Sequence, residues 1–502
     1  MSTTPLVMEL IPPPDPFTAC QRLGDLPFLL FLDSAADPEH LGRYSFLAAD
    51  PWCAVVSRGR AVEVVPTGNG RIPAIILRPG DDALAVTERL LEPLRAEPIA
   101  GLPPFQGGAA GYIGYDWGAV LERLPPTRYS DFGIPDVILG LYDWVIAWDH
   151  LERRAWLIST GMPERDAGAE TRAAARAEAV HQVLGGTLAG DQSGLGAGPL
   201  AGIGVPLAPE TVRAPSFPLP DVDAAHHAAI RSTFSHHAYL EAVARVVEYI
   251  VAGDIFQANL SQRFEAPLRE PPLALYGRLR ERNPAPFAAY LDFGGIRVVS
   301  ASPERFLRFD PASREVETRP IKGTRPRGTG PMHDAALGMA LTESAKDQAE
   351  NVMIVDLLRN DLSRVCRAGT VRVPELFALE HHPTVHHLVS TVTGELEPGR
   401  TAADLLRASF PGGSITGAPK VRAMEIIAEL EPTRRGVYCG SIGYWSRSGA
   451  LDTSIVIRTC LCLEEQVYFQ AGGGIVADSD PAEEYQETLD KAHALMLALA
   501  SS

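Results

Sequence analysis

The amino-acid sequence predicts a mixed fold of the α+β class. Short apolar runs separated by glycine and proline fill the first third of the chain, as expected of strands. Later segments place apolar residues along one helical stripe, and strands and helices follow one another without regular βαβ alternation. A chain of 502 residues with 46% hydrophobic side chains can bury the large core that such a fold needs. We therefore expect largely antiparallel sheets combined with helices.

Residues 17–159 form the strand-rich first part. The apolar runs 54–56, 74–77 and 144–148 are predicted strands. The glycine-rich segment 107–116 lacks the residue order of a nucleotide phosphate loop, so we expect its glycines to allow close backbone packing instead.

The middle of the chain separates two structural parts. Residues 165–184 are rich in alanine and charged side chains and predict a helix, whereas residues 185–220 are rich in glycine, alanine and proline and predict a linker or a surface insertion. The predicted organisation is an N-terminal region (1–160), a helical and linker region (161–235) and a C-terminal region (236–502).

The C-terminal region mixes helices and strands. A helix beginning near His237 carries an apolar stripe and is closed by Gly253. Further helices are expected near 343–362, 420–430 and 481–498, and strands near 297–299 and 454–462.

The composition argues against several classes of function. A formal charge of −17, from 62 acidic and 45 basic residues, leaves no basic surface for nucleic-acid phosphates. The six cysteines are sparse and lack zinc-binding spacing, as in a reduced protein of the cytosol. Neither an export signal nor a run of eighteen apolar residues is visible, so we expect no membrane span and a cytoplasmic location.

Lys322 is the first candidate catalytic side chain. It stands between Pro-Ile and Gly-Thr, with Arg319 and Arg325 on either side. We predict a stiff turn in which the neighbouring positive charges lower the pKa of the amine towards the nucleophilic range. The alternative is a solvated surface lysine.

Glutamates on two predicted helices form a second candidate site. Glu350 shares one helical face with charged neighbours, and Glu487 shares another with Glu484 and Lys491. The three glycines at 472–474 predict a turn whose backbone amides approach a ligand. A few carboxylates combined with substrate oxygens suit Mg²⁺, whereas solvated charged faces are the alternative.

Several long motifs resemble one enzyme family, and they occur in that family's order. They lie at residues 253–264, 302–306, 318–327, 349–357, 410–420, 471–476 and 484–488. Together they resemble the chorismate-utilising enzymes, the family of anthranilate synthase component I, with far more specificity than any single short pattern. The resemblance implies two large, mainly antiparallel sheets packed face to face with helices outside.

Three positions resemble one branch of the family more than the others. Anthranilate synthases usually carry alanine where this chain has Lys322, and Val-Pro where it has Asn259 and Leu260. Isochorismate-forming relatives carry a lysine at the position of Gln257, where it activates water. The resemblance thus implies the aminodeoxychorismate branch, which converts chorismate and ammonia to 4-amino-4-deoxychorismate for 4-aminobenzoate and folate biosynthesis. An anthranilate synthase component I-like enzyme and a non-catalytic tryptophan-binding subunit are the alternatives.

The resemblance also implies a role for each motif residue. Lys322 would attack C2 of chorismate while Glu304, which then needs a raised pKa, protonates the departing C4 hydroxyl. Glu350 and Glu487 would hold Mg²⁺, a Lewis acid for the ring carboxylate. The alternatives are a Glu304–Arg305 salt bridge and a solvent-facing Arg458. The expected chorismate-binding residues are Gln257, Gly323, Thr324, His387, Ser414, Tyr444, Arg458, Gly472, Gly473, Gly474 and Lys491.

Two further features follow from the same resemblance. A tryptophan pocket is implied, with its role in regulation or structure left open. No cysteine lies in the G-x-C-x-G setting of a glutaminase nucleophile, so ammonia would come from a separate glutamine amidotransferase subunit. The expected tryptophan-binding residues are Ser34, Arg43, Tyr44, Ser45, Pro284, Ala285 and Pro286.

Overall fold

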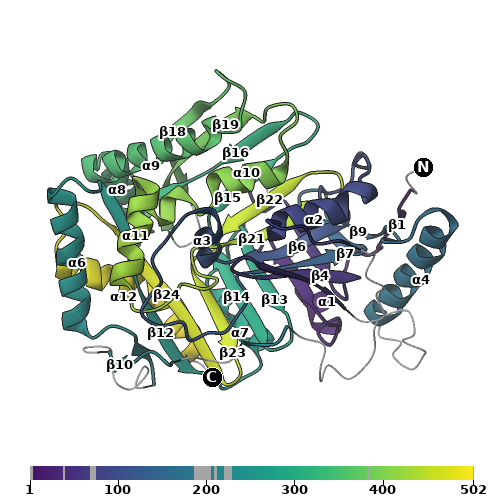
Figure 1. Cartoon of the computed structure of the whole chain (residues 1–502), viewed down its shortest axis with the longest axis horizontal. Coiled ribbons are helices and arrows are strands. Elements are labelled where there is room, and N and C mark those ends of the chain that lie inside the picture. Colours follow the sequence, from purple (N-terminus) through teal and green to yellow (C-terminus); the bar gives the residue numbers. More distant parts are fainter. Residues whose placement is uncertain are drawn as a thin grey trace.

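Two large antiparallel β-sheets form the centre of the molecule, as the α+β prediction requires (Figure 1). The computed structural model describes residues 4–37, 40–67, 75–185, 205–208, 212–219, 229–381 and 385–500. Neighbouring strands of the first sheet are β1 (Leu6–Glu9), β9 (Arg154–Ser159), β8 (Trp144–Asp149), β3 (Tyr44–Ala48), β2 (Leu29–Asp33), β13 (Phe287–Asp292), β14 (Ile296–Ser302), β23 (Thr459–Leu463), β24 (Gln466–Ile475), β12 (Gln257–Pro267), β11 (Arg231–Ser232) and β10 (Phe217–Pro218), with β20 (Gly417–Ala418) beside β12.

The second sheet is built in the same way. Its strands, again in order across the sheet, are β17 (Ile321–Pro326), β19 (Val385–Glu395), β16 (Glu315–Thr318), β15 (Arg305–Phe309), β22 (Leu451–Ile455), β21 (Ser441–Ser446), β6 (Gly108–Ile113), β7 (Val137–Tyr142), β4 (Cys53–Arg58) and β5 (Ala61–Pro66), with β18 (Arg372–His381) beside β19. Both sheets contain strands from before residue 160 and after residue 236, because β2 pairs with β13 and β6 pairs with β21. The two regions therefore share one structural unit.

The sheets pack face to face across a shared apolar layer. Strand side chains alternate between the two faces of a sheet. Leu30 of β2 belongs to the layer between the sheets, together with Ile138 of β7 and Ile442 of β21, whereas Leu29 and Phe31 point to the outer face of the first sheet. The predicted face-to-face arrangement is confirmed.

Helices cover the outer faces of both sheets (Figure 1). One group packs on the first sheet, a second group packs on the second sheet, and a third cluster joins helices to β12 and β24. The helices are α1 (Pro16–Arg22), α2 (Ala83–Leu91), α3 (Gly118–Leu121), α4 (Asp166–Leu184), α6 (His236–Val251), α7 (Pro272–Arg282), α8 (Pro331–Thr342), α9 (Ala345–Ser363), α10 (Ala402–Ser409), α11 (Lys420–Leu430) and α12 (Pro481–Ala500), with short 3₁₀ turns η1 (Glu92–Leu94), η2 (Tyr115–Trp117) and η3 (Gly413–Ile415).

Most predicted elements are present, and two are wrong. Helix α11 has the predicted bounds, and a Cβ on Gly111 would lie 2.0 Å from the Ile138 carbonyl oxygen, which confirms close packing in the glycine-rich segment. The predicted strand at 74–77 is irregular from residue 75 onward, and residue 74 lies outside the described residues. The glycines at 472–474 lie within β24, since they pair with β12, and form no turn. Much of the predicted insertion at 185–220 also lies outside the described residues.

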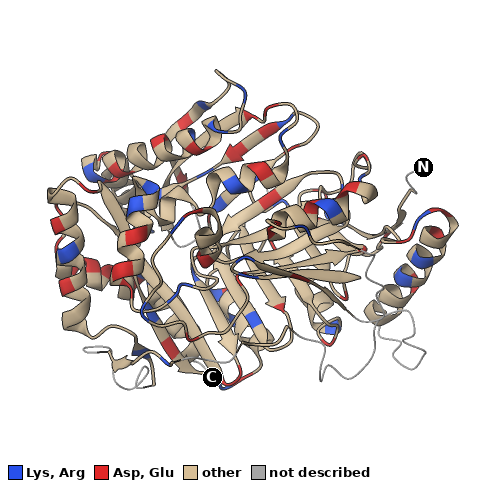
Figure 2. Cartoon of the chain, viewed as in Figure 1, with Lys and Arg blue, Asp and Glu red and all other residues tan. Residues whose placement is uncertain are grey.

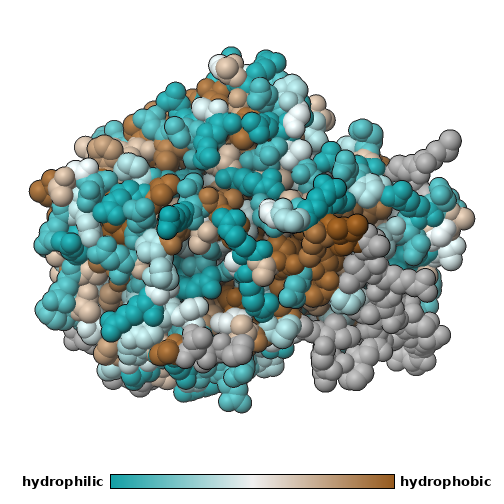
Figure 3. Space-filling view, viewed as in Figure 1, coloured by the Kyte–Doolittle hydropathy of each residue, from teal (hydrophilic) through white to brown (hydrophobic). Residues whose placement is uncertain are grey.

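Charged and apolar side chains are distributed as expected for this layered fold. In Figure 2 most coloured charges lie on helices and loops, while the central strands are mainly tan. Figure 3 shows a largely hydrophilic face with an apolar area below α2. Among the described residues, no helix combines the length and apolarity needed to cross a membrane.

Candidate active site

Lys322 lies on β17 at the edge of the second sheet, packed against helix α9. The pairing of β17 with β19 moves from Ile321↔Val389 to Thr324↔His387, so one extra residue bulges from β17. Gly323 adopts a φ of +85° within this bulge. Such a bulge can re-aim a side chain, and here the buried Lys322 amine reaches the first turns of α9.

The Lys322 amine forms an ion pair with Glu350. The distance from Lys322 Nζ to Glu350 Oε1 is 2.7 Å. Burial favours the neutral amine, but the negative charges of Glu350, Glu304 and Glu487 outweigh it and raise the pKa of Lys322. In the free protein the amine is therefore held as an ammonium group.

The predicted lowering of the Lys322 pKa by its flanking arginines is wrong. Arg319 forms an ion pair with Glu380, and Arg325 pairs with Asp347 at 2.9 Å. Each guanidinium charge is thus compensated by its own carboxylate. The glutamates near Lys322 therefore determine the direction in which its pKa is shifted.

Glu304 stands between β14 and β15 and is 4% exposed. Ser414 Oγ donates a 2.6 Å hydrogen bond to Glu304 Oε1. Burial raises the pKa of Glu304 to about 7, although the Ser414 hydrogen bond and the Lys322 charge oppose that rise. The pKa direction agrees with the predicted general acid. Arg305 pairs with Asp452 at 3.1 Å, so the alternative salt bridge between neighbours is not formed.

Glu350 is the carboxylate that joins α9 to the first sheet. Besides the Lys322 amine, it accepts a 2.6 Å hydrogen bond from Gln257 Nε2 at the start of β12. Burial alone would raise the pKa of Glu350, but the Lys322 charge outweighs burial and lowers it. Glu350 is therefore an anion held by two donors.

Two adjacent glycines of β24 make room for carboxylates from α9 and α12. A Cβ on Gly474 would lie 2.6 Å from Glu350 Oε1. A Cβ on Gly473 would lie 3.3 Å from Glu487 Oε1 and 2.9 Å from Glu484 Oε2. Any larger residue would displace these acids. Glu484 was not among the predicted ligands, although its helical spacing to Glu487 is a usable sequence signal.

The carboxylates fit a hard cation such as Mg²⁺. Glu484 Oε2 is buried and has no hydrogen-bond partner, and Glu350 and Glu487 form ion pairs with Lys322 and Lys491. No cluster of three metal-ligating side chains occurs in the described part of the chain. Because Mg²⁺ often takes only one or two carboxylates and completes its shell with water and substrate oxygens, Glu350 and Glu487 are a sufficient donor set.

Several predicted chorismate-binding residues lie around these groups. On the paired strands β17 and β19, Thr324 Oγ1 and His387 Nδ1 are 2.8 Å apart. Lys491 Nζ donates a 2.9 Å hydrogen bond to the Gly472 carbonyl oxygen of β24. With Gln257, Gly473, Gly474 and Ser414 described above, these residues form one continuous region with Glu304 and Lys322.

Arg458 also belongs to this region. It lies between β22 and β23 with a φ of +50°, so it is not part of the predicted strand. Its guanidinium charge lowers the pKa of Glu304, and burial lowers the pKa of Arg458 itself. The two groups are close enough to interact, which argues against a solvent-facing arginine.

Tyr444 is placed elsewhere. On β21, its ring stacks on Phe105 with centroids 4.8 Å apart and meets Phe46 edge-on at 5.2 Å. It lines a separate cavity together with Arg43 and Tyr44. The prediction that Tyr444 binds chorismate is therefore not supported by its position, because alternation along β21 aims it into this second cavity.

The second cavity has a volume of about 630 Å³ and lies among the predicted tryptophan-binding segments. Ser34, Arg43, Tyr44 and Pro286 line it. Ser34 Oγ donates hydrogen bonds to the carbonyl oxygens of Tyr44 at 2.6 Å and Pro286 at 3.2 Å, which joins three distant segments. The remaining predicted residues are Ser45, Pro284 and Ala285. They lie close in the chain to the lining residues Tyr44 and Pro286 but do not line the cavity themselves.

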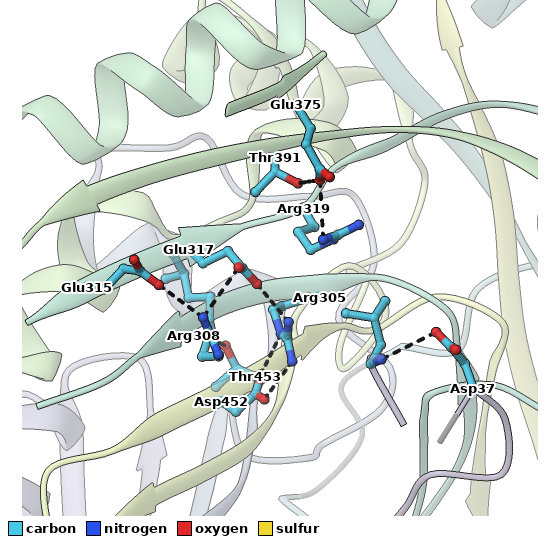
Figure 4. Close-up of polar contacts among 12 residues, drawn as sticks. Asp37, Arg305, Arg308, Glu315, Glu317, Arg319, Glu375, Thr391, Asp452 and Thr453 are labelled. Atoms are coloured by element: carbon cyan, nitrogen blue, oxygen red, sulfur yellow. Dashed lines mark hydrogen bonds and ion pairs between the residues drawn. The ribbon is translucent and has the colours of Figure 1, made fainter. Parts of the chain in front are cut away.

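Charged strands form one wall of this second cavity (Figure 4). Arg305 bridges Glu317 at 2.8 Å and Asp452 at 3.1 Å, and Arg308 contacts Glu317 at 3.4 Å. Arg305 directly follows Glu304 in the chain. Two consecutive residues where β15 begins therefore serve different sites: Glu304 belongs to the candidate active site, and Arg305 lines the second cavity.

Comparisons with known proteins identify relatives over most of the chain. The profile of a family described as chorismate binding enzyme matches residues 56–497. The chain is 40% identical over 479 residues to "Aminodeoxychorismate synthase component 1" of Escherichia coli, covering 95% of this chain and 94% of that protein. It is 43% identical over 419 residues to "Anthranilate synthase component 1" of Thermus thermophilus, covering 84% and 82%.

A solved structure gives the same picture. The crystal structure of anthranilate synthase component I from Streptococcus pneumoniae superimposes with a TM-score of 0.72 at 30% sequence identity, over 90% of this chain and 92% of that chain. The predicted two-sheet fold class is confirmed by this similarity.

Proposed function

We propose that this chain, which belongs to the chorismate binding enzyme family, transfers an amino group from ammonia to C4 of chorismate and produces 4-amino-4-deoxychorismate. The relatives named aminodeoxychorismate synthase component 1 are 40–42% identical over about 95% of the chain. The single observation that carries the proposal is the buried amine of Lys322 beside a second buried group, Glu304, whose pKa is raised to about 7 by burial and is lowered in part by the Lys322 charge. The product would serve 4-aminobenzoate and folate biosynthesis.

In the first chemical step Lys322 acts as nucleophile and Glu304 as general acid. The lone pair of the amine forms a bond to C2, the C1=C2 and C5=C6 double bonds shift to C1=C6 and C4=C5, and the C4–oxygen bond breaks. Glu304 gives its proton to the departing hydroxyl, which leaves as water. A covalent amine adduct and a Glu304 carboxylate remain.

In the second step ammonia resolves the adduct. Its nitrogen attacks C4, both double bonds shift back, and the C2–nitrogen bond breaks to release the neutral Lys322 amine. The Glu304 carboxylate then takes the surplus proton from the new amine. Chorismate and ammonia are thus converted to aminodeoxychorismate and water, with both catalytic groups restored.

Lys322 can attack only as a neutral amine. Its ion pair with Glu350 raises its pKa, so the pair must open and the amine must lose a proton before attack. Glu350 and Glu487 would hold Mg²⁺, which when bound would supply Lewis-acid polarisation of the ring carboxylate. Thr324, His387, Arg458 and Lys491 would orient the substrate's polar groups.

Ammonia would come from a separate glutamine amidotransferase subunit. All six cysteines are buried and free of disulfides. Burial raises the pKa of Cys439 to about 12, and the pKa values of the other cysteines with resolved shifts are raised in the same way. Such thiols are poor nucleophiles, which supports a partner that carries the glutaminase chemistry. Free cysteines also support the proposed cytoplasmic location.

The second cavity is proposed to bind tryptophan. Its 630 Å³ volume is ample for an indole side chain, and Phe46, Phe105 and Tyr444 provide aromatic surface. The charged wall formed by Arg305, Glu317 and Asp452 would bind the amino and carboxylate groups.

The product distinguishes the proposal from its main rival. A relative named anthranilate synthase component 1 is 43% identical, so an anthranilate-forming enzyme is the second candidate. The purified chain should be incubated with chorismate, Mg²⁺ and an ammonium salt, and the product identified by liquid chromatography and mass spectrometry. We expect aminodeoxychorismate and its loss on chelation of Mg²⁺; anthranilate as the main product would overturn the proposal.

A non-catalytic tryptophan-binding subunit is the third candidate. It has little support, because burying the charged or titratable groups of Lys322 and Glu304 costs stability, and a protein without catalytic activity would gain nothing in return. Absence of any chorismate turnover in the same assay, with tryptophan binding retained, would favour it.

A further inference from the structure

Glu431 and Arg435 form a fully buried ion pair behind the candidate active site. Glu431 follows the last residue of α11, and Glu431 and Arg435 are 4% and 2% exposed. Arg435 Nε and Nη2 donate to the two Glu431 oxygens at 2.9 and 2.7 Å, a bidentate arrangement. The ring of Tyr115 lies 4.5 Å from the guanidinium carbon. Neither residue contacts the proposed substrate-binding groups directly.

The same guanidinium also binds two backbone carbonyl groups. Nη1 donates to the Ile415 oxygen at 3.0 Å, in the 3₁₀ turn η3, and Nη2 donates to the Asn259 oxygen at 2.6 Å, on β12. Arg435 therefore connects one turn and one strand that are far apart in the sequence.

Glu431 strengthens the connection to β12. Its Oε1 accepts hydrogen bonds from both the backbone N–H and the hydroxyl of Ser261, each at 2.8 Å. The strand and the turn are also joined directly, since Asn259 N donates to the Thr416 oxygen at 2.8 Å. The ion pair and this bond fix η3 relative to β12.

Both connected segments carry active-site groups. Ser414, next to Ile415, donates to the Glu304 carboxyl. Gln257, two residues before Asn259, donates to Glu350, the partner of Lys322. Turn η3 thus holds the proposed acid Glu304, and strand β12 holds Glu350, the carboxylate that pairs with Lys322.

We infer that Glu431 and Arg435 are positioning residues, which set the Ser414–Glu304 hydrogen bond and the spacing between η3, which holds the proposed acid, and β12, which holds Glu350 through Gln257. This inference rests on the proposed function. A buried ion pair is poor evidence for stability, because apolar residues of similar volume are often as stable. Its geometry, with four donors directed at two oxygens of Glu431 and two backbone carbonyls, favours a role in positioning.

Arginine is required for this role because of its planar fork. A lysine at 435 would keep the charge but could not reach Glu431, Ile415 and Asn259 together. Arg435→Lys should therefore loosen η3 without leaving an uncompensated carboxylate. Glu431→Gln is the second variant, since it keeps an acceptor for Arg435 and serves if Arg435→Lys fails to fold.

Arg263 provides a matched control. It lies on the same strand β12, is 2% exposed, and pairs with Asp131 at 2.9 Å through its Nη1. Its contacts do not involve η3 or Glu304. Arg263→Lys thus makes the same chemical change in an equally buried ion pair that also involves strand β12.

The first measurement is independent of turnover. The carbonyl stretching band of protonated Glu304, assigned by its loss in Glu304→Gln, is followed by infrared spectroscopy as a function of pH. The other groups that act on Glu304 are Lys322, Arg458 and the Cys439 thiol. Because the Ser414 hydrogen bond stabilises the carboxylate, its loss should move the titration midpoint to higher pH in Arg435→Lys and in Ser414→Ala, but not in Arg263→Lys.

The second measurement uses ammonium-dependent turnover of chorismate. Arg435→Lys should lower kcat at least tenfold, with a smaller change in KM, and Arg263→Lys should not. Adding Ser414→Ala to Arg435→Lys should shift the midpoint no further, because both changes remove one interaction. An unchanged Glu304 midpoint in both Arg435→Lys and Glu431→Gln, or equal effects in the control, would overturn the inference. Absence of turnover in the unmodified protein would instead overturn the proposed function, and the infrared titration would still decide the positioning role.

Discussion

Lys322 Nζ lies 2.7 Å from Glu350 Oε1 inside the candidate active site. The amine on the second sheet and the carboxylate on α9 therefore neutralise one another in the free protein. Because Glu350 is also a proposed ligand of Mg²⁺, the same carboxylate would both control the charge of the proposed nucleophile and help to hold the cation.

Glu350→Gln should lower the pKa of Lys322. The negative charge of Glu350 is the main influence that opposes burial, so its removal leaves burial to favour the neutral amine. The rate at which an amine-modifying reagent labels Lys322 is followed by peptide mass spectrometry across pH. At neutral pH this rate should be higher in Glu350→Gln than in the unmodified protein. Glu343→Gln, at an exposed position just before α9, is the control. Equal labelling rates in the two variants would contradict the assignment.

Activity should fall as the pH rises through about 7. Glu304 must be protonated to act as an acid, and burial raises its pKa to about 7. The fall in kcat/KM above about pH 7 should be absent in Glu304→Gln, and the rate of this variant should be reduced roughly 100-fold or more. A fall that persists unchanged in Glu304→Gln would assign the titration to another group.

The same group predicts a pH dependence of stability. The folded-state pKa of about 7 exceeds the unfolded value of roughly 4.3, so the folded protein binds more protons between these values. The contribution of Glu304 to stability is thus fully present below the unfolded pKa and is lost as the pH rises through the folded pKa. Glu304→Gln should flatten this part of the curve of unfolding free energy against pH.

Tryptophan should raise the thermal unfolding midpoint by occupying the second cavity. At a concentration 100-fold above Kd the stabilisation is about 2.7 kcal/mol. Ser34→Phe should abolish the shift, because Ser34 lines the cavity and its hydroxyl joins two wall segments. Ser313→Phe, at an exposed serine outside the cavity, should keep it. Equal shifts in both variants would place tryptophan elsewhere.

Asp143→Ala should destabilise the fold strongly. Asp143 is fully buried and pairs with Arg172 at 2.8 Å and with the buried Arg176 at 3.0 Å. Removing one member of a buried ion pair leaves an uncompensated charge and costs about 3–5 kcal/mol. Urea unfolding measures the loss. Asp356→Ala removes an exposed ion pair and should leave the midpoint unchanged; a similarly small effect at Asp143 would be inconsistent with its burial.

The fold class and many elements could be predicted from the sequence because they depend on local patterns. Helix α11 follows from apolar spacing bounded by Pro419, and α12 follows from the same periodicity after Pro481. The strand β24 was partly misread, since three consecutive glycines usually mark a turn. In the structure Gly473 and Gly474 are needed because carboxylates from other elements lie close to where a Cβ would be, and a Cβ on Gly472 would lie 2.4 Å from the Leu260 carbonyl oxygen.

The site could be predicted only where a residue's role is visible in its own motif. Glu304 and Lys322 were found through the family resemblance, but the charge state of Lys322 was not, because Glu350 lies 28 positions away on another element. Tyr444 was misplaced because a motif does not reveal which face of β21 a residue occupies. The Glu431–Arg435 pair is visible in the sequence only as an i,i+4 spacing that many surface ion pairs share, whereas the contacts of Arg435 to backbone carbonyls leave no pattern in the sequence.

The covalent role of Lys322 is the central claim, and peptide mass spectrometry tests it most directly. The protein is incubated with chorismate and Mg²⁺ without ammonia, quenched rapidly and digested. We predict a mass increase equal to chorismate minus water on the peptide containing Lys322, its disappearance on addition of an ammonium salt, and no adduct in Lys322→Ala. Aminodeoxychorismate formation by Lys322→Ala at the unmodified rate, with no adduct on Lys322 in the parent protein, would contradict the mechanism.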